Sequence, residues 1–338
     1  MDLNTSTEKN YGIAFLRVLL SFMVVMDHFY NKKRKAKFVH ILYYHIPTFF
    51  LMSFYYTNKT FTTFNISKIK LRFQRIVIPY ISWSIISFIL NNIYFYCFKV
   101  QKPHTLNHFV ENLLNGHVFI LALWFQNVLI FTTLIISITV LLFKNDYLLI
   151  FLSFLILSYA FQYSGINYHF FTKNFTLLYY ATFGRFLETL PNSLCGFFIA
   201  SFNIMCILKN YTYKTIIICS CILLFISTYR FKNNLLSFKY AGIRLNTAAI
   251  CIFLIFFNLP LTKIKNIRIK KLFDSITNYT AGIYFVHYLI GKGYIMKIFL
   301  GNKIESVFGC LFIYFTSYIV CFCLDKLLRN TKFRHLIK

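Results

Sequence analysis

Apolar runs of about 20 residues recur along almost the whole chain, separated by short polar segments. As an α-helix, a run of this length spans the roughly 30 Å hydrocarbon core of a bilayer. The second run is short, and the sixth is long enough to be tilted. The pattern predicts about ten membrane-spanning helices, at residues 11–30, 41–57, 76–98, 118–143, 147–165, 177–208, 214–230, 241–259, 276–298 and 305–325.

The runs follow one another without a linker, a low-complexity segment or an obvious repeat. Composition agrees with a membrane protein: 58% of the 338 residues are hydrophobic and only 13% are charged. A soluble domain carries about 25% charged residues. We therefore expect residues 1–338 to form a single all-α, polytopic membrane domain with its helices in one bundle. The first run lacks a signal-peptide cleavage site, so we expect it to be a permanent span.

The net charge of +27 does not indicate nucleic-acid binding. Lysine and arginine form short clusters between the apolar runs, where membrane topology places them, and there is no nucleic-acid-binding motif. The segments 58–75 and 260–275 and the tail 326–338 are rich in these residues, which predicts that both termini are cytoplasmic. A basic cluster at residues 32–37 opposes this orientation, but the sum favours it.

Nine cysteines are present, nearly all of them inside apolar runs. Their spacing does not match a zinc site, so we expect them to fill the apolar core and predict no metal. There is also no Ser-His-Asp signature and no phosphate-binding glycine loop.

The first apolar run contains Arg17 and His28, which are eleven residues apart. Eleven steps of about 100° end roughly 20° past three full turns, so both side chains lie on one helical face, about 16 Å apart along the axis. An arginine inside a span costs about 2.5–3.5 kcal/mol, and such a residue usually faces a protein interior or a water-filled cavity. The alternatives are that Arg17 extends to the cytoplasmic headgroups and that His28 is an interfacial, hydrogen-bonded histidine.

The third span is preceded by basic residues that include Arg72 and Arg75. Residues three apart share a helical face, and two guanidinium groups suit a multiply charged phosphate. Placing them at a helix N-terminus would add the positive end of the helix dipole. The alternative is a basic flank that only fixes the topology.

Tyr284 and His287 are also three residues apart, and His287 lies near the middle of its predicted span. An ionisable residue at that depth is a functional candidate, although a core histidine bonded to a neighbouring helix is an equal alternative. Trp124 lies at the outer edge of the fourth span, where tryptophan often anchors a helix. Arg185 and Glu188 have the spacing of an ion pair that lowers its own insertion cost.

Taken together and in this order, these residues resemble the membrane-bound acyltransferase family 3. The family's first span carries Arg or Lys, then ten residues, then His, and Arg17 and His28 match this motif. Its third span opens with R-x-x-R, which Arg72 and Arg75 match. Weaker matches are HIPTFFLMSFYY, in which Ser53 agrees but Phe54 replaces the usual glycine, LALWFQNVLIF around Trp124, and AGIYFVHYLI around Tyr284 and His287. The resemblance covers essentially the whole chain.

This resemblance implies transfer of an acyl group, commonly acetyl, from a coenzyme A thioester to a hydroxyl of a cell-envelope glycan or lipid-linked sugar. Arg72 and Arg75 would bind acetyl-CoA, and His28, with Arg17, would be catalytic, either as a base or as a transient acyl carrier. His287, Tyr284 and Trp124 would line the path of substrate or acyl group. The composition of the chain is typical of an AT-rich bacterial genome. We therefore expect the protein to lie in the bacterial inner membrane.

Two other functions fit part of the pattern. A glycan or lipid transporter would also place charged residues inside the membrane, but we find no repeated half with interrupted helices. A glycan polymerase or glycosyltransferase would need a site rich in carboxylates, and the chain has only nine Asp and Glu residues.

Overall fold

The apolar runs fold into helices, and the all-α prediction is confirmed for every element that the structure describes. In this computed structural model the described residues are 10–30, 44–98, 105–115, 123–164, 179–233, 243–259, 267–292 and 305–331. Their helices are α1 (Tyr11–Phe29), α3 (His45–Thr62), α4 (Ile66–Phe98), α5 (Leu106–Asn115), α6 (Trp124–Leu142), α7 (Tyr147–Tyr163), α9 (Tyr179–Ser201), α10 (Ile204–Leu208), η2 (Lys209–Tyr211), α11 (Thr212–Asn233), α12 (Ile243–Asn258), α13 (Ile267–Asn278), α14 (Thr280–Lys292) and α16 (Val307–Leu327).

Within these residues, 5 helical stretches are long and apolar enough to cross a membrane: Tyr11–Phe29, Ile66–Leu90, Trp124–Leu142, Ile204–Ile226 and Val307–Leu327. Two shorter apolar helices, Tyr147–Tyr163 and Ile243–Asn258, add to them. These stretches are typical of a membrane protein. The predicted number of about ten spans is not confirmed.

The third predicted span begins earlier than hydropathy indicates. The helix α4 starts at Ile66, because the side chain of Asn65 accepts a hydrogen bond of 3.1 Å from the backbone N–H of Lys68 and so caps the helix. Arg72 and Arg75 therefore lie within the second and third turns and not at a helix N-terminus. Pro79 lies in the interior of this helix.

Two other predicted spans are interrupted. The run 177–208 is divided between α9 and α10, because Asn203 adopts a left-handed conformation with φ of 51°. The run 276–298 is divided at Tyr279, between α13 and α14. This second break places the end of α13 beside the start of α14, and residues of both line the site described below.

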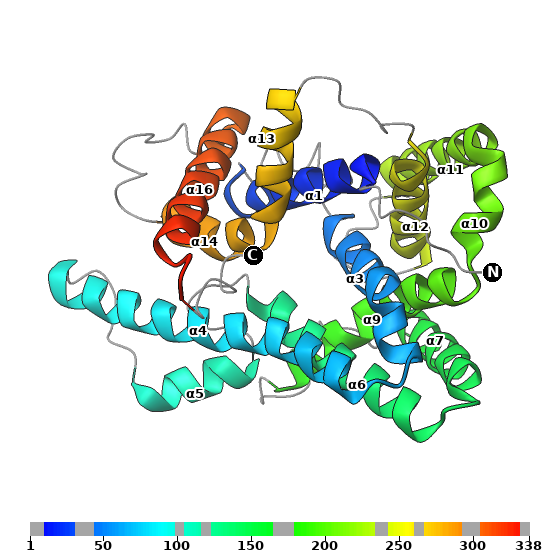
Figure 1. Ribbon diagram of the computed structural model, residues 1–338, viewed down its shortest axis with the longest axis horizontal. Coiled ribbons are helices and arrows are strands. Elements are labelled where there is room, and N and C mark those ends of the chain that lie inside the picture. Colours follow the sequence, from blue (N-terminus) through cyan, green and yellow to red (C-terminus); the bar gives the residue numbers. More distant parts are fainter. Residues whose placement is uncertain are drawn as a thin grey trace.

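The helix α1 lies at the centre of the fold and contacts α3, α12, α13, α14 and α16 (Figure 1). The long helix α4 runs past α6 on the other side of the molecule, with α5 packed against it. Small residues permit the closest crossings: a Cβ on Gly196 of α9 would lie 2.1 Å from the backbone oxygen of Leu51 on α3. This close crossing fixes α3, one of the helices that line the cavity described below.

Candidate functional site

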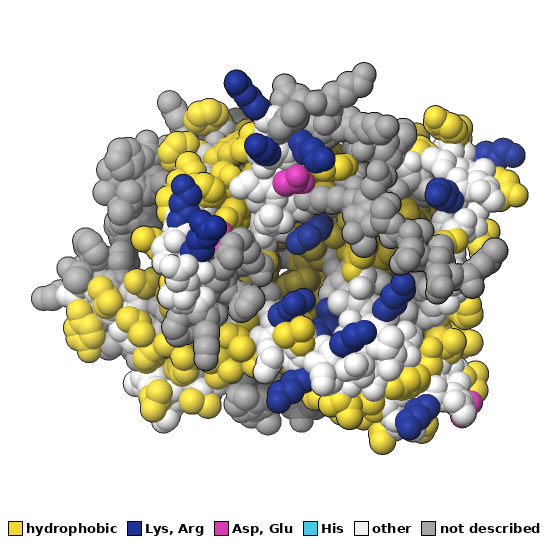
Figure 2. All heavy atoms as spheres, in the orientation of Figure 1, with side chains coloured by type: hydrophobic (Ala, Val, Ile, Leu, Met, Phe, Trp, Pro, Cys, Tyr) yellow, Lys and Arg dark blue, Asp and Glu magenta, His cyan; other side chains and the backbone are white. Residues whose placement is uncertain are grey.

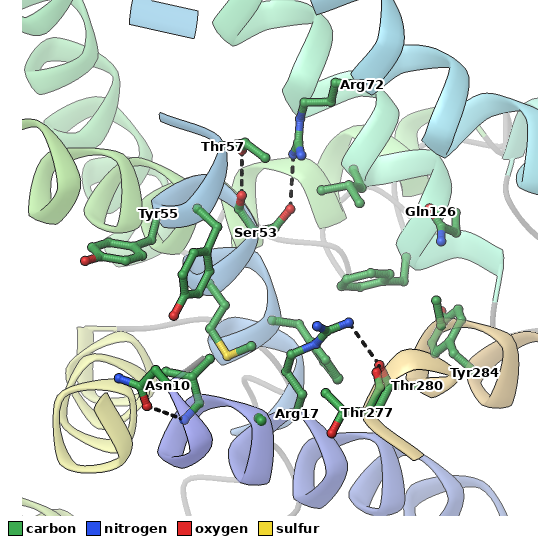
Figure 3. Close-up of a pocket in the computed structure, with 18 of the residues that line it drawn as sticks. Asn10, Arg17, Ser53, Tyr55, Thr57, Arg72, Gln126, Thr277, Thr280 and Tyr284 are labelled. Atoms are coloured by element: carbon green, nitrogen blue, oxygen red, sulfur yellow. Dashed lines mark hydrogen bonds between the residues drawn. The ribbon is translucent and has the colours of Figure 1, made fainter. Parts of the chain in front are cut away.

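A cavity of about 820 Å³ lies between α1, α3, α4, α6, α12, α13 and α14. Its size is within the range of roughly 300–1,000 Å³ that is typical of small-molecule sites. Figure 2 shows a hollow on this face of the molecule, with Lys and Arg side chains around it. The helix α12 contributes the apolar Phe257, and the polar lining residues come from the other helices or their flanks (Figure 3): Asn10, Arg17, Ser53, Tyr55, Tyr56, Thr57, Arg72, Gln126, Thr277, Thr280 and Tyr284.

Arg72 forms the α4 side of this cavity and is held from several directions. Its Nη2 donates a 3.1 Å hydrogen bond to the hydroxyl of Ser53 on α3. Its guanidinium carbon lies 5.2 Å from the ring centre of Phe54 and 5.6 Å from that of Phe61. The Nε of Arg72 is buried without a hydrogen-bond partner among the described residues. A cation with an unsatisfied donor at a cavity wall is suited to an anionic ligand.

Arg17 forms the opposite side of the cavity. Its Nη2 donates a 3.1 Å hydrogen bond to the hydroxyl of Thr280, at the start of α14, and Figure 3 shows its guanidinium pointing into the cavity. This geometry favours a cavity role over an extension of the side chain to the headgroups. Arg17 and Arg72 thus place two guanidinium groups on facing walls of one cavity.

Arg75 does not share this setting. It is exposed, and it is not among the residues that line the cavity. The prediction that Arg72 and Arg75 form one paired guanidinium site is therefore wrong in its geometry. Three residues along a helix still leave about 60° between side chains, which is enough to turn one into the cavity and the other away from it.

Tyr284 lies at the end of the cavity formed by α14 and α6. Its ring centre is 5.4 Å from that of Phe125, and its hydroxyl forms a hydrogen bond with the backbone of Phe125 in the first turn of α6. One turn further along α14, the ring of His287 lies 6.1 Å from that of Tyr284. The face shared by Tyr284 and His287 therefore leads from the cavity into the helix bundle.

His287 is fully buried and lies beside His28, with a distance of 5.3 Å between the ring centres. Its Nδ1 is 3.0 Å from the backbone oxygen of Ile283. Because a carbonyl oxygen only accepts hydrogen bonds, this contact places the proton of the neutral ring on Nδ1 and the lone pair on Nε2. That Nε2 is buried without a hydrogen-bond partner among the described residues.

Arg17 and His28 both contact α14, as two residues on one face of α1 should. The contact between the two histidines was not expected, because spacing within one helix does not show which helices pack together. The structure brings them together, and the series Arg17, Tyr284, His287 and His28 lines the interface between α1 and α14.

Trp124 is buried and is not among the cavity-lining residues. The guanidinium carbon of Arg185, on α9, lies 4.2 Å from the centre of a Trp124 ring. Trp124 therefore contacts a cation inside the bundle, and it is not a simple anchor at the membrane edge. Trp124 was predicted to line the acyl path, but it is the adjacent residue Phe125 that lines the cavity.

Sequence reasoning missed several polar residues of the cavity. Ser53 was noted only as part of a family motif, yet it accepts the hydrogen bond from Arg72. Thr280 is four residues before Tyr284 on the same face of α14, so helical periodicity was a usable signal. Gln126 carries a buried oxygen without a hydrogen-bond partner among the described residues, but no spacing in the sequence pointed to it.

Metal ligands do not gather in the part of the chain that the structure describes: no group of three or more His, Cys, Asp or Glu residues could hold an ion there. The cavity instead offers guanidinium, hydroxyl and amide groups, which suit an organic anion with additional hydrogen-bonding groups.

Comparison with protein families gave one match, which covers nearly the whole chain. A family model described as an acyltransferase domain, acyltransferase family 3, matches residues 10–326. No curated protein and no solved structure matched the chain.

Proposed function

This chain belongs to acyltransferase family 3, and on that premise we propose that it transfers an acetyl group from acetyl-CoA to a hydroxyl of a bacterial surface polysaccharide or its lipid-linked precursor. We place it in the inner membrane with both termini in the cytoplasm, in accord with the basic loops. The observation that carries the proposal is the single cavity in which Arg17, Arg72 and Tyr284 meet, with the histidine pair directly behind Tyr284.

The charges of the cavity support an acyl-CoA donor. The phosphates of coenzyme A carry several negative charges, and Arg17 and Arg72 supply cations on facing walls of the cavity. Because Arg75 is exposed and does not line the cavity, we assign it the role of attracting the anionic donor before binding.

The histidine pair supports the transfer step. In the proposed reaction His28 takes the proton of the acceptor hydroxyl, whose oxygen forms a bond with the carbonyl carbon of the thioester. The carbon–sulfur bond then breaks, and the leaving sulfur takes up a proton to give the free thiol of coenzyme A. His287, whose Nε2 carries a lone pair, lies where it can hold the His28 imidazole in position.

The test uses the purified protein in proteoliposomes with acetyl-labelled acetyl-CoA and surface glycan from the host. We expect release of the free thiol together with appearance of the label on the glycan, and loss of both in His28→Ala. Movement of glycan or lipid across the bilayer without thioester cleavage would instead show that the protein is a transporter and would overturn the proposal.

A further inference from the structure

Tyr284 is a phenol on the cavity wall, next to the histidine pair. Acyl transfer passes through a tetrahedral intermediate whose oxygen is negatively charged, and enzymes stabilise it with hydrogen-bond donors fixed in advance. Tyr284 lines the cavity, and its ring lies between the cavity and His287. A thioester bound in this cavity can therefore present its carbonyl oxygen to this phenol.

The environment of Tyr284 favours hydrogen-bond donation. Its hydroxyl is bonded to the backbone of Phe125, in the first turn of α6, where backbone N–H groups point out of the helix. The helix N-terminus also carries a partial positive charge, which stabilises negative charge nearby. A hydroxyl that accepts a hydrogen bond is polarised and becomes a better donor.

The cation Arg185 lies near Tyr284. Arg185 on α9 stacks on Trp124, the first residue of α6, with 4.2 Å between the guanidinium carbon and a ring centre. It is close enough to Tyr284 for the two side chains to interact electrostatically. Since Trp124 directly precedes Phe125, the stacking fixes the cation at the same helix end that contacts the phenol.

We propose that Tyr284 is the oxyanion-stabilising residue of the acyl transfer, and that Arg185, held on Trp124, is a positioning residue that polarises it. This role rests on the proposed function. It also gives Trp124 and Arg185, which do not line the cavity, a place in the reaction.

The step balances as follows. The acceptor oxygen bonds to the carbonyl carbon as His28 removes its proton, and the π electrons of the carbonyl move onto the carbonyl oxygen. The O–H of Tyr284 donates a hydrogen bond to that oxyanion and keeps its proton. When the carbonyl reforms, the carbon–sulfur bond breaks, its electron pair stays on sulfur, and the thiolate is protonated by the imidazolium of His28.

The other polar groups of the cavity fit this role less well. Arg17 and Arg72 donate to Thr280 and Ser53. Ser53 and Arg72 lie on the wall opposite α14, whereas Tyr284 is one helical turn from His287 (Figure 3). Of the two α14 hydroxyls that line the cavity, those of Thr280 and Tyr284, that of Tyr284 is nearer to His287 along the helix.

The test compares Tyr284→Phe with Tyr314→Phe in the full-length protein. Tyr314 is the control because it is also buried and also bonds between helices, 2.9 Å from the hydroxyl of Ser21, but lies outside the cavity. We expect Tyr284→Phe to lower kcat about 100-fold, as loss of one oxyanion donor does, with little change in KM for acetyl-CoA. Tyr314→Phe should retain kcat.

A second measurement separates stabilisation of the oxyanion from donor binding. The probe is a coenzyme A analogue with a tetrahedral, anionic sulfonate in place of the thioester carbonyl. Tyr284→Phe should bind this analogue far more weakly than wild type does, yet bind acetyl-CoA equally well. Arg185→Gln should show the same pattern to a smaller degree, and Arg185→Lys should recover part of the loss because it keeps the charge.

Two failures can be told apart. If the wild-type protein does not cleave acetyl-CoA, the proposed function is wrong, and the role of Tyr284 is wrong with it. If the wild type is active and Tyr284→Phe keeps its kcat, or loses affinity for acetyl-CoA and the analogue equally, only the role of Tyr284 is wrong.

Discussion

The two walls of the cavity hold their arginines in different ways. On the α3–α4 wall, Arg72 contacts two phenylalanine rings and one serine hydroxyl, and part of its guanidinium is buried without a hydrogen-bond partner among the described residues. On the α1–α14 wall, Arg17 donates to Thr280, and the same face of α14 continues to Tyr284 and His287. One wall thus presents a cation fixed among aromatic rings, and the other connects a cation to titratable groups.

This difference indicates a division of labour. A guanidinium held between rings is rigid and loses little entropy when an anion binds, so the α3–α4 wall is suited to anchoring a donor. The α1–α14 wall presents a cation and a phenol, and two imidazoles lie next to the phenol on the same pair of helices, which is the chemistry needed to move protons and stabilise charge. We expect Arg72 variants to change donor affinity and His28 and Tyr284 variants to change the rate, while Arg17, which also faces the donor phosphates, contributes to affinity as well.

The largest effect is expected on the α1–α14 wall. His28→Ala removes the proposed base, and loss of a general base typically lowers the rate about 10²–10⁴-fold. The measurement is the transfer of labelled acetyl groups from acetyl-CoA to the glycan, made on membranes that contain equal amounts of inserted wild-type or variant protein. Unchanged acylation would remove His28 from the mechanism.

The next effect is expected on the α3–α4 wall. Arg72→Gln removes a cation whose charge-assisted contacts are worth about 1.5–3 kcal/mol each, so KM for acetyl-CoA should rise at least about tenfold. Arg72→Lys should restore little, because an ammonium group cannot replace a planar guanidinium between Phe54 and Phe61. Full recovery by lysine would show that charge alone matters there.

A smaller effect is expected where Arg17 meets α14. Thr280→Val preserves the shape of the side chain but removes the oxygen that accepts the bond from Arg17, a contact worth roughly 0.5–1.5 kcal/mol. The value of kcat/KM should fall about tenfold or less, with the protein still inserted and folded. Activity at the wild-type level would mean that Thr280 does not position Arg17.

The smallest effect is expected at Arg75, which serves as the matched control for Arg72. It is exposed and lies outside the cavity, so Arg75→Gln should change KM by less than the Arg72 variant and mainly in low salt. Measuring KM at two ionic strengths checks this. Equal losses for the two variants would restore the paired-arginine site that the sequence suggested.

Much of the fold was predictable because long apolar runs favour helices. The first helix was predicted to within one residue, at 11–30 against Tyr11–Phe29. The start of α4 was missed by ten residues, because the cap at Asn65 begins the helix inside a basic segment that hydropathy excludes. The breaks at Asn203 and Tyr279 lie inside apolar runs, where hydropathy has no signal.

The site was predictable residue by residue but not as an arrangement. Helical spacing placed Arg17 and His28 on one face, and both contact α14. Spacing within one helix cannot show which helices pack together, so the contact of His28 with His287 and the facing positions of Arg17 and Arg72 were missed. Arg72 differs from Arg75 because it contacts Ser53 and aromatic rings on α3. The R-x-x-R motif on α4 contains no information about these partners on another helix.

The most direct test of the two-wall account is the affinity of acetyl-CoA for His28→Ala and for Arg72→Gln, measured by titration calorimetry on the purified proteins. The account predicts that His28→Ala binds the donor as wild type does while its turnover is lost, and that Arg72→Gln binds it at least about tenfold more weakly. Wild-type affinity in Arg72→Gln, or an equal loss of affinity in both variants, would contradict it.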